Sequence, residues 1–332
     1  MKIWFRINGL EFCSWFIVWK ALMKAFKQVG AEVPDSPFNP PKKVEQYIEL
    51  HWADPAFWGW SNQKVTLKAG IALSEHRSLM HPEKAIPNLQ QCEVLFCPAV
   101  SAAQAFYEAP LSCPIEIVPF GIDENMTFFP SRDWEDDVFK FLLIGAAQFR
   151  KGSWLAVEAF REAFGDRTDV QLTVASFSET PMFQRLRREY GRYENIKFYD
   201  KTSDVRDYYH THHVLVSSHL AEGWGLTIPE AMATGMPCII SRCSAPREYF
   251  QDLFGWWIEM SDLYAPVDQC LTGVKGSWRL PNKDSIKAQM LYAVEHRDEC
   301  EEKGKVASQF VLENLTWKQS AEKICQILER HL

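Results

Sequence analysis

Residues 214–241 read VLVSSHLAEGWGLTIPEAMATGMPCIIS, and this stretch decides the fold. It opens on a short apolar run, as expected of a parallel strand that is covered on both faces. The two glycines of residues 223–225 (Gly-Trp-Gly) then give the backbone of a loop conformational freedom. A second apolar run follows at residues 237–241. Between loop and second run we expect a short helix with Thr227 as its N-cap and Gly235 at its end. The pattern predicts strand, loop, helix, turn and strand.

A ligand at this loop would meet both an anion-binding helix start and two carboxylates. At the carboxyl end of a parallel strand, a ligand faces the N-terminus of the next helix, where free amides favour an anion. We therefore expect a diphosphate over Gly225, Leu226 and Thr227. Glu222 and Glu230 flank the loop, and an ionised carboxylate accepts hydrogen bonds from two adjacent hydroxyls. A phosphate flanked by two polyols describes a nucleotide sugar.

The stretch closely resembles the donor-site signature of retaining GT-B glycosyltransferases, especially glycosyltransferase family 4 (glycosyl transferases group 1). The pattern E-G-(aromatic)-G-L-x-x-x-E-A-M-A-x-G-x-P is matched without a gap over residues 222–237. The resemblance implies that Glu222 lies near the transferred sugar and that Glu230 binds the ribose hydroxyls. Thr227 and Glu230 also have the spacing of a capping box, in which Glu230 would bond only the backbone of its own helix. The complete block favours the ligand role.

A second motif, Gly-Ala-Ala-Gln-Phe-Arg-Lys-Gly at residues 145–152, follows the predicted strand at residues 138–144. A basic pair on a loop before a helix suits a diphosphate. The motif resembles the family's G-R-x-x-x-R-K-G, which implies that Arg150 and Lys151 neutralise the leaving diphosphate. Ala146 stands where the family has its first arginine. Either Arg150 substitutes for that arginine or the anion site is weaker. The alternative to a diphosphate-binding role is that the motif is only the solvated start of a helix.

The N-terminal third resembles the family less closely. Residues 2–7 predict the first strand, and Gly9 lies in the turn before a helical segment at residues 12–29. In the family a glycine loop at this place passes under the donor diphosphate, which implies a donor role for Gly9. A single glycine also fits an ordinary turn.

Two further strand ends carry polar side chains. Residues 44–50 predict a strand that leads to a His-Trp-Ala-Asp-Pro segment, which fits either an acceptor pocket or an exposed loop. A strand at residues 64–73 leads to Glu75 and His76. The family often presents Glu or His here to the donor sugar, so the resemblance implies that His76 contacts the sugar. Glu75 and His81 are competing candidates, and a solvated strand end is the structural alternative.

The motifs predict an α/β protein of GT-B architecture, in which two Rossmann-like domains face each other across a cleft. The segment Ile-Glu-Ile-Val-Pro-Phe-Gly-Ile-Asp at residues 115–123 resembles the family's V-I-P-x-G-(V/I)-D signature. We place the acceptor-side domain at residues 1–130 and the donor domain at residues 131–315, with an acidic linker between them. The tail resembles the family's closing S-W-x-x-x-A motif, which implies a final helix at about residues 316–332 that crosses back to the first domain.

Composition sets the class of protein. The chain has 332 residues, enough for two domains, and 47% of them are hydrophobic and 24% charged, as in soluble globular proteins. A net charge of −7 argues against general nucleic-acid binding. No apolar run reaches 18 residues, so we expect no membrane span, while peripheral membrane contact stays open. Scattered cysteines and the lack of a secretory leader pattern at residues 12–19 favour a cytoplasmic protein with free thiols.

The predicted function is retaining transfer of a sugar from a nucleoside-diphosphate sugar to a hydroxyl of a glycan, lipid or small molecule. The resemblance implies no protein nucleophile, no cofactor and no essential metal, because basic residues replace the cation. A His-Thr-His-His run at residues 210–213 invites a metal site, but no acidic or cysteine partner follows at ligand spacing. The alternatives are a GT-B nucleotide-sugar epimerase or phosphorylase, and a catalytically degenerate protein that binds nucleotide sugars or glycans.

Overall fold

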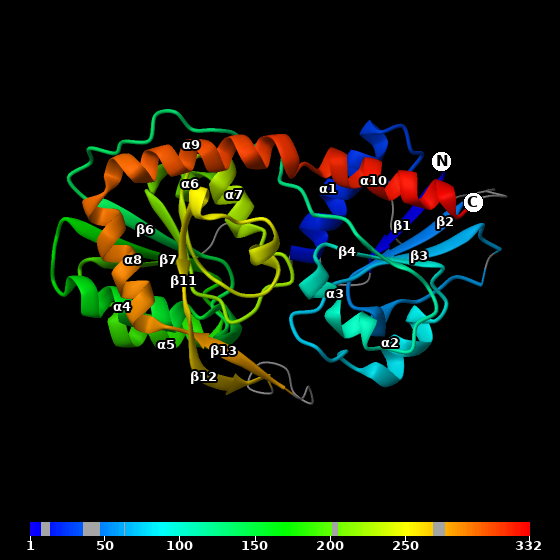
Figure 1. Ribbon diagram of the computed structural model, residues 1–332, viewed down its shortest axis with the longest axis horizontal. Helices are drawn as coiled ribbons and strands as arrows, with labels where there is room; N and C mark the ends of the chain where they lie inside the picture. Colours follow the sequence, from blue (N-terminus) through cyan, green and yellow to red (C-terminus); the bar gives the residue numbers. More distant parts are fainter. Residues whose placement is uncertain (8–13, 36–46, 63, 201–204, 268–275) are drawn as a thin grey trace. The chain divides into compact units, whose positions relative to one another are not determined.

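The chain divides into two compact units, which Figure 1 shows in a computed structural model. The structure describes residues 1–7, 14–35, 47–62, 64–200, 205–267 and 276–332. Unit 1 comprises Met1–Asp123 and Leu315–Leu332, and unit 2 comprises Glu124–Asn314. The first boundary thus lies a few residues before position 130, where the sequence motifs place it.

Unit 1 is built on a five-stranded parallel sheet in the order β1-β2-β3-β4-β5. Its strands are β1 (Ile3–Ile7), β2 (Ile48–Trp52), β3 (Leu67–Ile71), β4 (Val94–Cys97) and β5 (Ile115–Ile117). All five strands are short and mostly apolar, as expected of a sheet with both faces covered. Among these described strands the order follows the sequence without a reversal.

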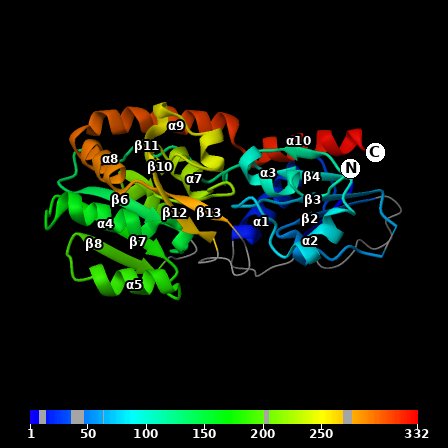
Figure 2. The ribbon, with the colours of Figure 1, turned by 60° about the horizontal axis from the view of Figure 1, so that its bottom comes forward.

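The helices of unit 1 pack on this sheet (Figure 2), and its core is rich in aromatic side chains. They are α1 (Ser14–Gln28), α2 (Pro82–Leu89), α3 (Val100–Tyr107) and α10 (Trp317–Arg330), together with the 3-10 turn η1 (Pro55–Phe57). Val18, Leu22 and Phe26 recur at helical spacing along α1 and are almost fully buried. The last helix, α10, packs against α1 within unit 1, and its Ser320 hydroxyl donates to the Pro119 carbonyl at 2.7 Å.

Unit 2 is built on a six-stranded parallel sheet in the order β11-β10-β9-β6-β7-β8. Its strands are β6 (Phe139–Ile144), β7 (Val170–Ser176), β8 (Ile196–Asp200), β9 (Val214–Ser217), β10 (Cys238–Ser241) and β11 (Gly255–Ile258). The chain first moves outward from β6 to β8 and then returns to build the other half from β9 to β11. The order therefore reverses between β6 and β9, as in the dinucleotide-binding fold, where ligands bind at the reversal.

Helices cover both faces of the six-stranded sheet (Figures 1 and 2). They are α4 (Ser153–Phe164), α5 (Pro181–Tyr190), α6 (Arg206–Thr211), α7 (Thr227–Ala233), α8 (Lys283–Glu295) and α9 (Arg297–Asn314). α7 packs against α9, and α4 packs against α8. A separate two-stranded antiparallel sheet, β12 (Met260–Pro266) with β13 (Ser277–Pro281), follows β11.

The segment expected as an acidic linker is packed onto unit 2. The Phe128 ring lies so close to Gly235 that a Cβ on this glycine would come within 2.7 Å of it. The Phe129 amide donates to the Thr234 carbonyl at 3.2 Å, and the Arg132 side chain is buried. Aromatic and basic side chains within this segment therefore anchor it to the rest of unit 2.

Candidate functional site

The two donor motifs meet at the reversal of strand order in unit 2. β6 and β9 are parallel neighbours, with Phe141 opposite Val214 and Leu142 opposite Leu215. The loop after β6 carries the Arg-Lys-Gly motif, and the loop after β9 carries Glu222. Since both strands end at the same edge of the sheet, the fold brings the two motifs together.

Gly152 fixes the contact between these two loops. Its φ is +63°, and a Cβ at this position would lie 1.8 Å from the Ser218 carbonyl oxygen, so only glycine fits. The Ser218 hydroxyl donates to the Gly152 carbonyl at 2.8 Å, and the Leu220 amide donates to the Arg150 carbonyl at 2.8 Å. The backbone of the Arg-Lys-Gly loop is thus held against the loop that leads to Glu222.

Glu222 is paired with both basic residues of the motif. Lys151 Nζ donates to Glu222 Oε1, and Arg150 Nη1 lies 3.3 Å from Oε2 and also donates to the Ala221 carbonyl. Burial alone would raise the pKa of Glu222, but Lys151 and Arg150 outweigh burial and lower it to about 2. Glu222 is therefore an anion at neutral pH and stands between two cations.

The backbone of Glu222 is held by a loop on its other side. The Glu222 amide donates to the Ser244 hydroxyl at 2.8 Å, and the Ala245 amide donates to the Glu222 carbonyl at 3.3 Å. Ser244 has a φ of +51°, which is uncommon for a residue other than glycine. Both the side chain and the main chain of Glu222 are thus fixed by their neighbours.

A pocket opens beside this ion pair, at the carboxyl ends of the central strands. Lys151, Glu222 and Thr227 line it, whereas Arg150, Gly225, Leu226 and Glu230 are not among its lining residues. The remaining lining residues come from the ends of β6, β7 and β9 and from the start of α4: Leu143, Ile144, Gly145, Ala146, Ala147, Ser153, Val174, Ala175, Ser176, Val216 and Ser217. Among the described residues, Lys151 is thus the cation that lines this pocket.

The prediction that Thr227 caps the following helix was wrong. α7 begins at Thr227 itself, and Leu226 is the N-cap residue, already near helical angles, with no side-chain capping bond. The capping box is not formed either, because Glu230 Oε2 accepts a hydrogen bond from the Tyr209 hydroxyl at 2.8 Å. The expected end at Gly235 is confirmed: its φ is +79°, and its amide donates to the Met232 carbonyl at 2.9 Å.

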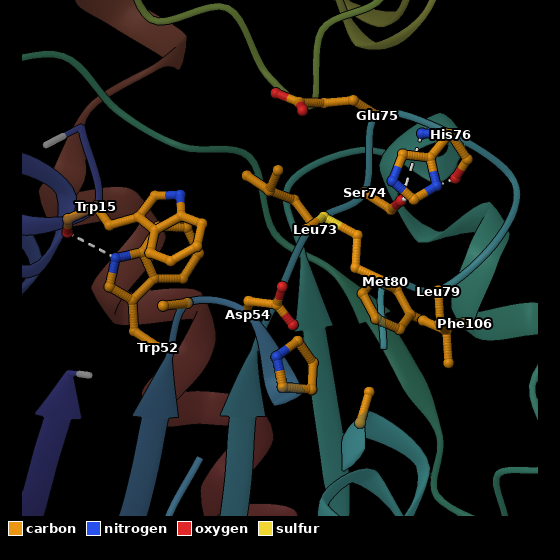
Figure 3. A pocket seen from close by; sticks show the side chains of 13 residues that line it. Trp15, Trp52, Asp54, Leu73, Ser74, Glu75, His76, Leu79, Met80 and Phe106 are labelled. Atoms are coloured by element: carbon orange, nitrogen blue, oxygen red, sulfur yellow. Dashed lines mark hydrogen bonds between the residues drawn. The ribbon is translucent and has the colours of Figure 1, made fainter. Parts of the chain in front are cut away.

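Unit 1 has a pocket of its own at the ends of β2 and β3, which Figure 3 shows. The Asp54 carboxylate lies between the indoles of Trp15 and Trp52 on one side and Met80 on the other. Asp54 Oδ1 accepts a hydrogen bond from the Ala56 amide at 2.9 Å. Among the described residues, none donates to Oδ2. Burial raises the pKa of Asp54.

His76 lines the same pocket of unit 1, as does Glu75. The Ser74 hydroxyl donates to the His76 carbonyl at 2.8 Å and accepts from the His76 amide at 3.3 Å, so a tight turn follows β3. The other N-terminal candidate, Gly9, lies outside the described residues.

The histidines of residues 210–213 have structural partners. His210 stacks on Phe129, with ring centroids 4.3 Å apart. His213 Nδ1 accepts from the Lys140 amide at 2.8 Å, and His213 Nε2 lies 2.6 Å from the Asp133 carbonyl oxygen. In the described part of the chain, no three His, Cys, Asp or Glu side chains are grouped to hold a metal ion.

Every cysteine that the structure describes is a free thiol. Among the described helices, none is long and apolar enough to span a membrane.

Residues 125–270, which contain the Lys151–Glu222 pair, match the family model described as glycosyl transferases group 1. This part of the chain is a glycosyl transferases group 1 domain. It contains Arg150, Lys151, Glu222 and the Gly225–Glu230 segment, and it leaves Gly9 and His76 outside the match. The resemblance that the sequence motifs predict is confirmed for this part.

Solved structures similar to the whole chain are glycosyltransferases of GT-B fold. A sucrose-phosphate synthase from Thermosynechococcus elongatus aligns over 99% of this chain and 98% of its own, with a TM-score of 0.72 and 14% identity. A glycosyltransferase from Rickettsia africae covers 99% and 98%, with a TM-score of 0.71 and 12% identity. HepE from Anabaena, in complex with UDP and glucose, covers 99% and 100%, with a TM-score of 0.71 and 11% identity. A search of curated protein sequences finds no match.

The glycosyl transferases group 1 domain also contains two buried residues that the sequence analysis missed. Tyr209 donates to Glu230, and Arg132 Nη1 donates to the Tyr209 carbonyl at 2.9 Å. Tyr209 lies in a short polar helix, and Arg132 lies beside an acidic run, so neither shows a local pattern typical of burial. Their roles arise only from contacts between distant parts of the sequence.

Proposed function

We propose that this chain is a retaining glycosyltransferase that moves a sugar from a nucleoside-diphosphate sugar to a hydroxyl acceptor. The observation that carries the proposal is that Lys151 and Glu222 line one pocket at the strand reversal of a glycosyl transferases group 1 domain. A cation and a carboxylate side by side suit a substrate in which an anion is joined to a polyol. The UDP and glucose bound by HepE make UDP-sugars the first donors to test.

In this proposal the basic residues stabilise the departing diphosphate. Lys151 faces the pocket and would bind a phosphate oxygen directly, while Arg150 holds the loop and keeps a positive field behind Glu222. α7 has only seven residues, so its dipole adds little and the side-chain cations would carry most of the stabilisation. Ala146 lines the pocket without a charge, which makes Lys151 more important.

The two glutamates would hold the two polyol parts of the donor. Glu222 would accept hydrogen bonds from the sugar hydroxyls and support positive charge near the anomeric carbon. Glu230 would bind the ribose. The bond from the anomeric carbon to the diphosphate breaks, the acceptor oxygen bonds to the same face, and the acceptor proton passes to a phosphate oxygen of the leaving group. The proposal therefore needs neither a protein nucleophile nor a divalent metal.

On the acceptor side we place the pocket of unit 1. The half-buried Trp15 indole beside a carboxylate suits a glycan, because sugars combine apolar C–H faces with hydroxyl donors, and no described residue donates to Asp54 Oδ2. His76 in the same pocket is our candidate for contact with the transferred sugar. These observations favour a glycan over a lipid as the acceptor.

The proposal is tested by incubating the protein with UDP-, GDP- and ADP-sugars and a panel of glycans, followed by NMR of the product. We expect a product with the anomeric configuration of the donor, formed equally well with EDTA present. An inverted product would overturn the retaining mechanism. Epimerised donor, or phosphorolysis of a glycan, as the main product would overturn the transferase. Tight donor binding without any product would favour the binding-protein alternative.

A further inference from the structure

Tyr209 and Glu230 form a buried side-chain pair that links α6 to α7. We propose that Tyr209 is a positioning residue for the donor: its hydroxyl holds the Glu230 carboxylate ready for the ribose diol, and Arg132 holds the two helices that carry the pair. The inference rests on the proposed function, because it assumes that Glu230 binds the ribose of a nucleoside diphosphate.

The hydroxyl of Tyr209 can act here only as a donor to the carboxylate. The side chain is fully buried, and its oxygen lies 2.8 Å from Glu230 Oε2. Burial raises the pKa of Tyr209 well above its ordinary range, and the negative charge of Glu230 raises it further. The phenol thus stays protonated, and a hydrogen bond to a charged acceptor is stronger than a neutral one.

This bond sets the orientation of the carboxylate. The last torsion of a glutamate side chain is broad, so an unrestrained carboxylate samples many orientations. A ribose diol requires acceptor lone pairs at two adjacent hydroxyls, and one carboxylate can supply them. Because Tyr209 already binds Oε2, the remaining lone pairs of Glu230 have a fixed direction before the nucleotide arrives. Such preorganisation strengthens binding by reducing the ordering cost.

Arg132 fixes the two helices relative to each other. Its guanidinium donates to the Tyr209 carbonyl at 2.9 Å and to the His212 carbonyl at the end of α6, and to the Thr234 carbonyl at 3.1 Å at the end of α7. Arg132 is almost fully buried, and in the described part of the chain no carboxylate pairs with it. Carbonyls at the C-terminal ends of helices carry partial negative charge, which suits a cation.

A second set of contacts, from α9, holds the end of α7. A Cβ on Gly304 of α9 would lie 2.0 Å from the carbonyl oxygen of Gly235, so α9 contacts the backbone of the turn that follows α7. The Ser308 hydroxyl of α9 donates to the Ala233 carbonyl at 2.6 Å. These contacts hold the backbone at the end of α7, and the Tyr209 hydrogen bond adds order to the Glu230 side chain.

The test compares nucleotides with and without the ribose hydroxyls. Calorimetry first identifies which of UDP, GDP and ADP binds the wild-type protein most tightly, and its 2′,3′-dideoxy form is then measured too. We expect Tyr209→Phe to weaken binding of the ribonucleotide about tenfold, which corresponds to about 1.4 kcal/mol. Binding of the dideoxy nucleotide should change less than about twofold, because the contact that Tyr209 supports is then missing.

Tyr249→Phe is the matched control. Tyr249 is also a buried tyrosine of unit 2, and its hydroxyl donates to the Trp224 carbonyl at 3.0 Å. Its loss should lower the melting temperature comparably but leave the ratio of ribose to dideoxy affinity unchanged. Equal weakening of both nucleotides by Tyr209→Phe, or no weakening of either, would overturn the inference. If none of the three nucleotides binds the wild-type protein at millimolar concentration, the proposed function itself fails and the inference fails with it.

Discussion

Lys151 and Glu222 are bound to each other: the ammonium group of Lys151 donates to Oε1 of the carboxylate, at the edge of the pocket that both residues line. The sequence motifs assign these residues to different parts of the donor, the phosphate and the sugar. The pair holds Glu222 ionised, and it keeps Lys151 beside the place where charge would develop. In the proposed function, an incoming diphosphate would compete with Glu222 for Lys151, which would couple donor binding to the ion pair.

Removal of the Lys151 charge should slow sugar transfer far more than it weakens acceptor binding. We expect Lys151→Met to reduce kcat by roughly 100- to 1000-fold, the usual effect of removing one donor to a developing anion. Lys287→Met removes a lysine at the surface of unit 2, paired with Asp284, and should leave kcat unchanged. Initial rates at saturating donor and acceptor measure the effect. A wild-type kcat for Lys151→Met would show that Lys151 does not serve the leaving group.

Glu222 should matter more for stability than Lys151. Glu222→Gln leaves two cations without their shared anion in a buried place, and we expect a loss of roughly 3 kcal/mol in the free energy of unfolding. Lys151→Met removes a partly exposed partner and leaves Arg150 opposite Glu222, so a loss of about 1 kcal/mol is expected. Urea unfolding measures both changes. The double variant should be no less stable than Glu222→Gln alone, since it removes one of the orphaned cations; strict additivity would contradict the coupling.

Gly152 should tolerate no side chain. Gly152→Ala would force apart the Arg150 and Ser218 loops, and we expect a loss of roughly 3 kcal/mol together with loss of donor binding. Gly30→Ala is the control, because Gly30 also has a positive φ, +84°, but no other group lies within 4 Å of the place that a Cβ would occupy. It should cost only about 1 kcal/mol. Thermal unfolding measures the loss of stability in both variants. Equal losses in Gly152→Ala and Gly30→Ala would mean that backbone strain, not the loop contact, dominates at Gly152.

The sequence predicts unit 2 well because its signals are local. Apolar runs, glycines and charged loop residues follow one another at the spacing of a parallel α/β unit, and strand ends carry the chemistry. The motifs therefore locate Lys151 and Glu222 in the loops after β6 and β9, where the structure has them. The N-cap of α7 was missed because Leu226 adopts helical angles without any capping side chain, so composition gave no signal.

Contacts between distant segments could not be predicted. Arg132 lies beside the acidic run read as the interdomain linker, yet its guanidinium is bound to a carbonyl of α6 and to the carbonyl of the C-cap residue of α7. Glu230 could form either a capping box within α7 or a hydrogen bond to another part of the fold. Only the position of Tyr209 decides between these two interactions. In unit 1, the pocket around Asp54 depends on how α1 and the turn after β2 pack, which no motif specifies.

Acid should destabilise unit 2 through its buried histidines. Burial lowers the pKa of His213 from 6.5 to about 4, and the same holds for His212 and His219. Between pH 6.5 and 4 the unfolded chain binds protons that the folded chain does not, so stability falls as pH falls through this range. Each histidine should contribute about 2 kcal/mol to the loss between pH 8 and pH 5. Urea midpoints measured across this range test the expectation.

His213→Gln separates this effect from general acid sensitivity. The variant should be less stable than wild type at pH 8, because His213 bonds to the Lys140 amide and the Asp133 carbonyl. Glutamine does not titrate, so the difference in the free energy of unfolding between wild type and His213→Gln should shrink by about 2 kcal/mol from pH 8 to pH 5. A difference that stays constant over this range would show that His213 titrates normally in the folded protein.

Asp54 should act on the acceptor and not on the donor. Asp54→Asn keeps an oxygen to accept from the Ala56 amide but removes the negative charge, so the turn of η1 should survive. If Oδ2 accepts from acceptor hydroxyls, we expect KM for the acceptor to rise about tenfold with KM for the donor unchanged, because charged hydrogen bonds are worth roughly 1.5–3 kcal/mol. Glu83→Gln, an exposed carboxylate of the same unit, should change neither constant. A rise in the donor KM alone would instead place this pocket on the donor side of the reaction.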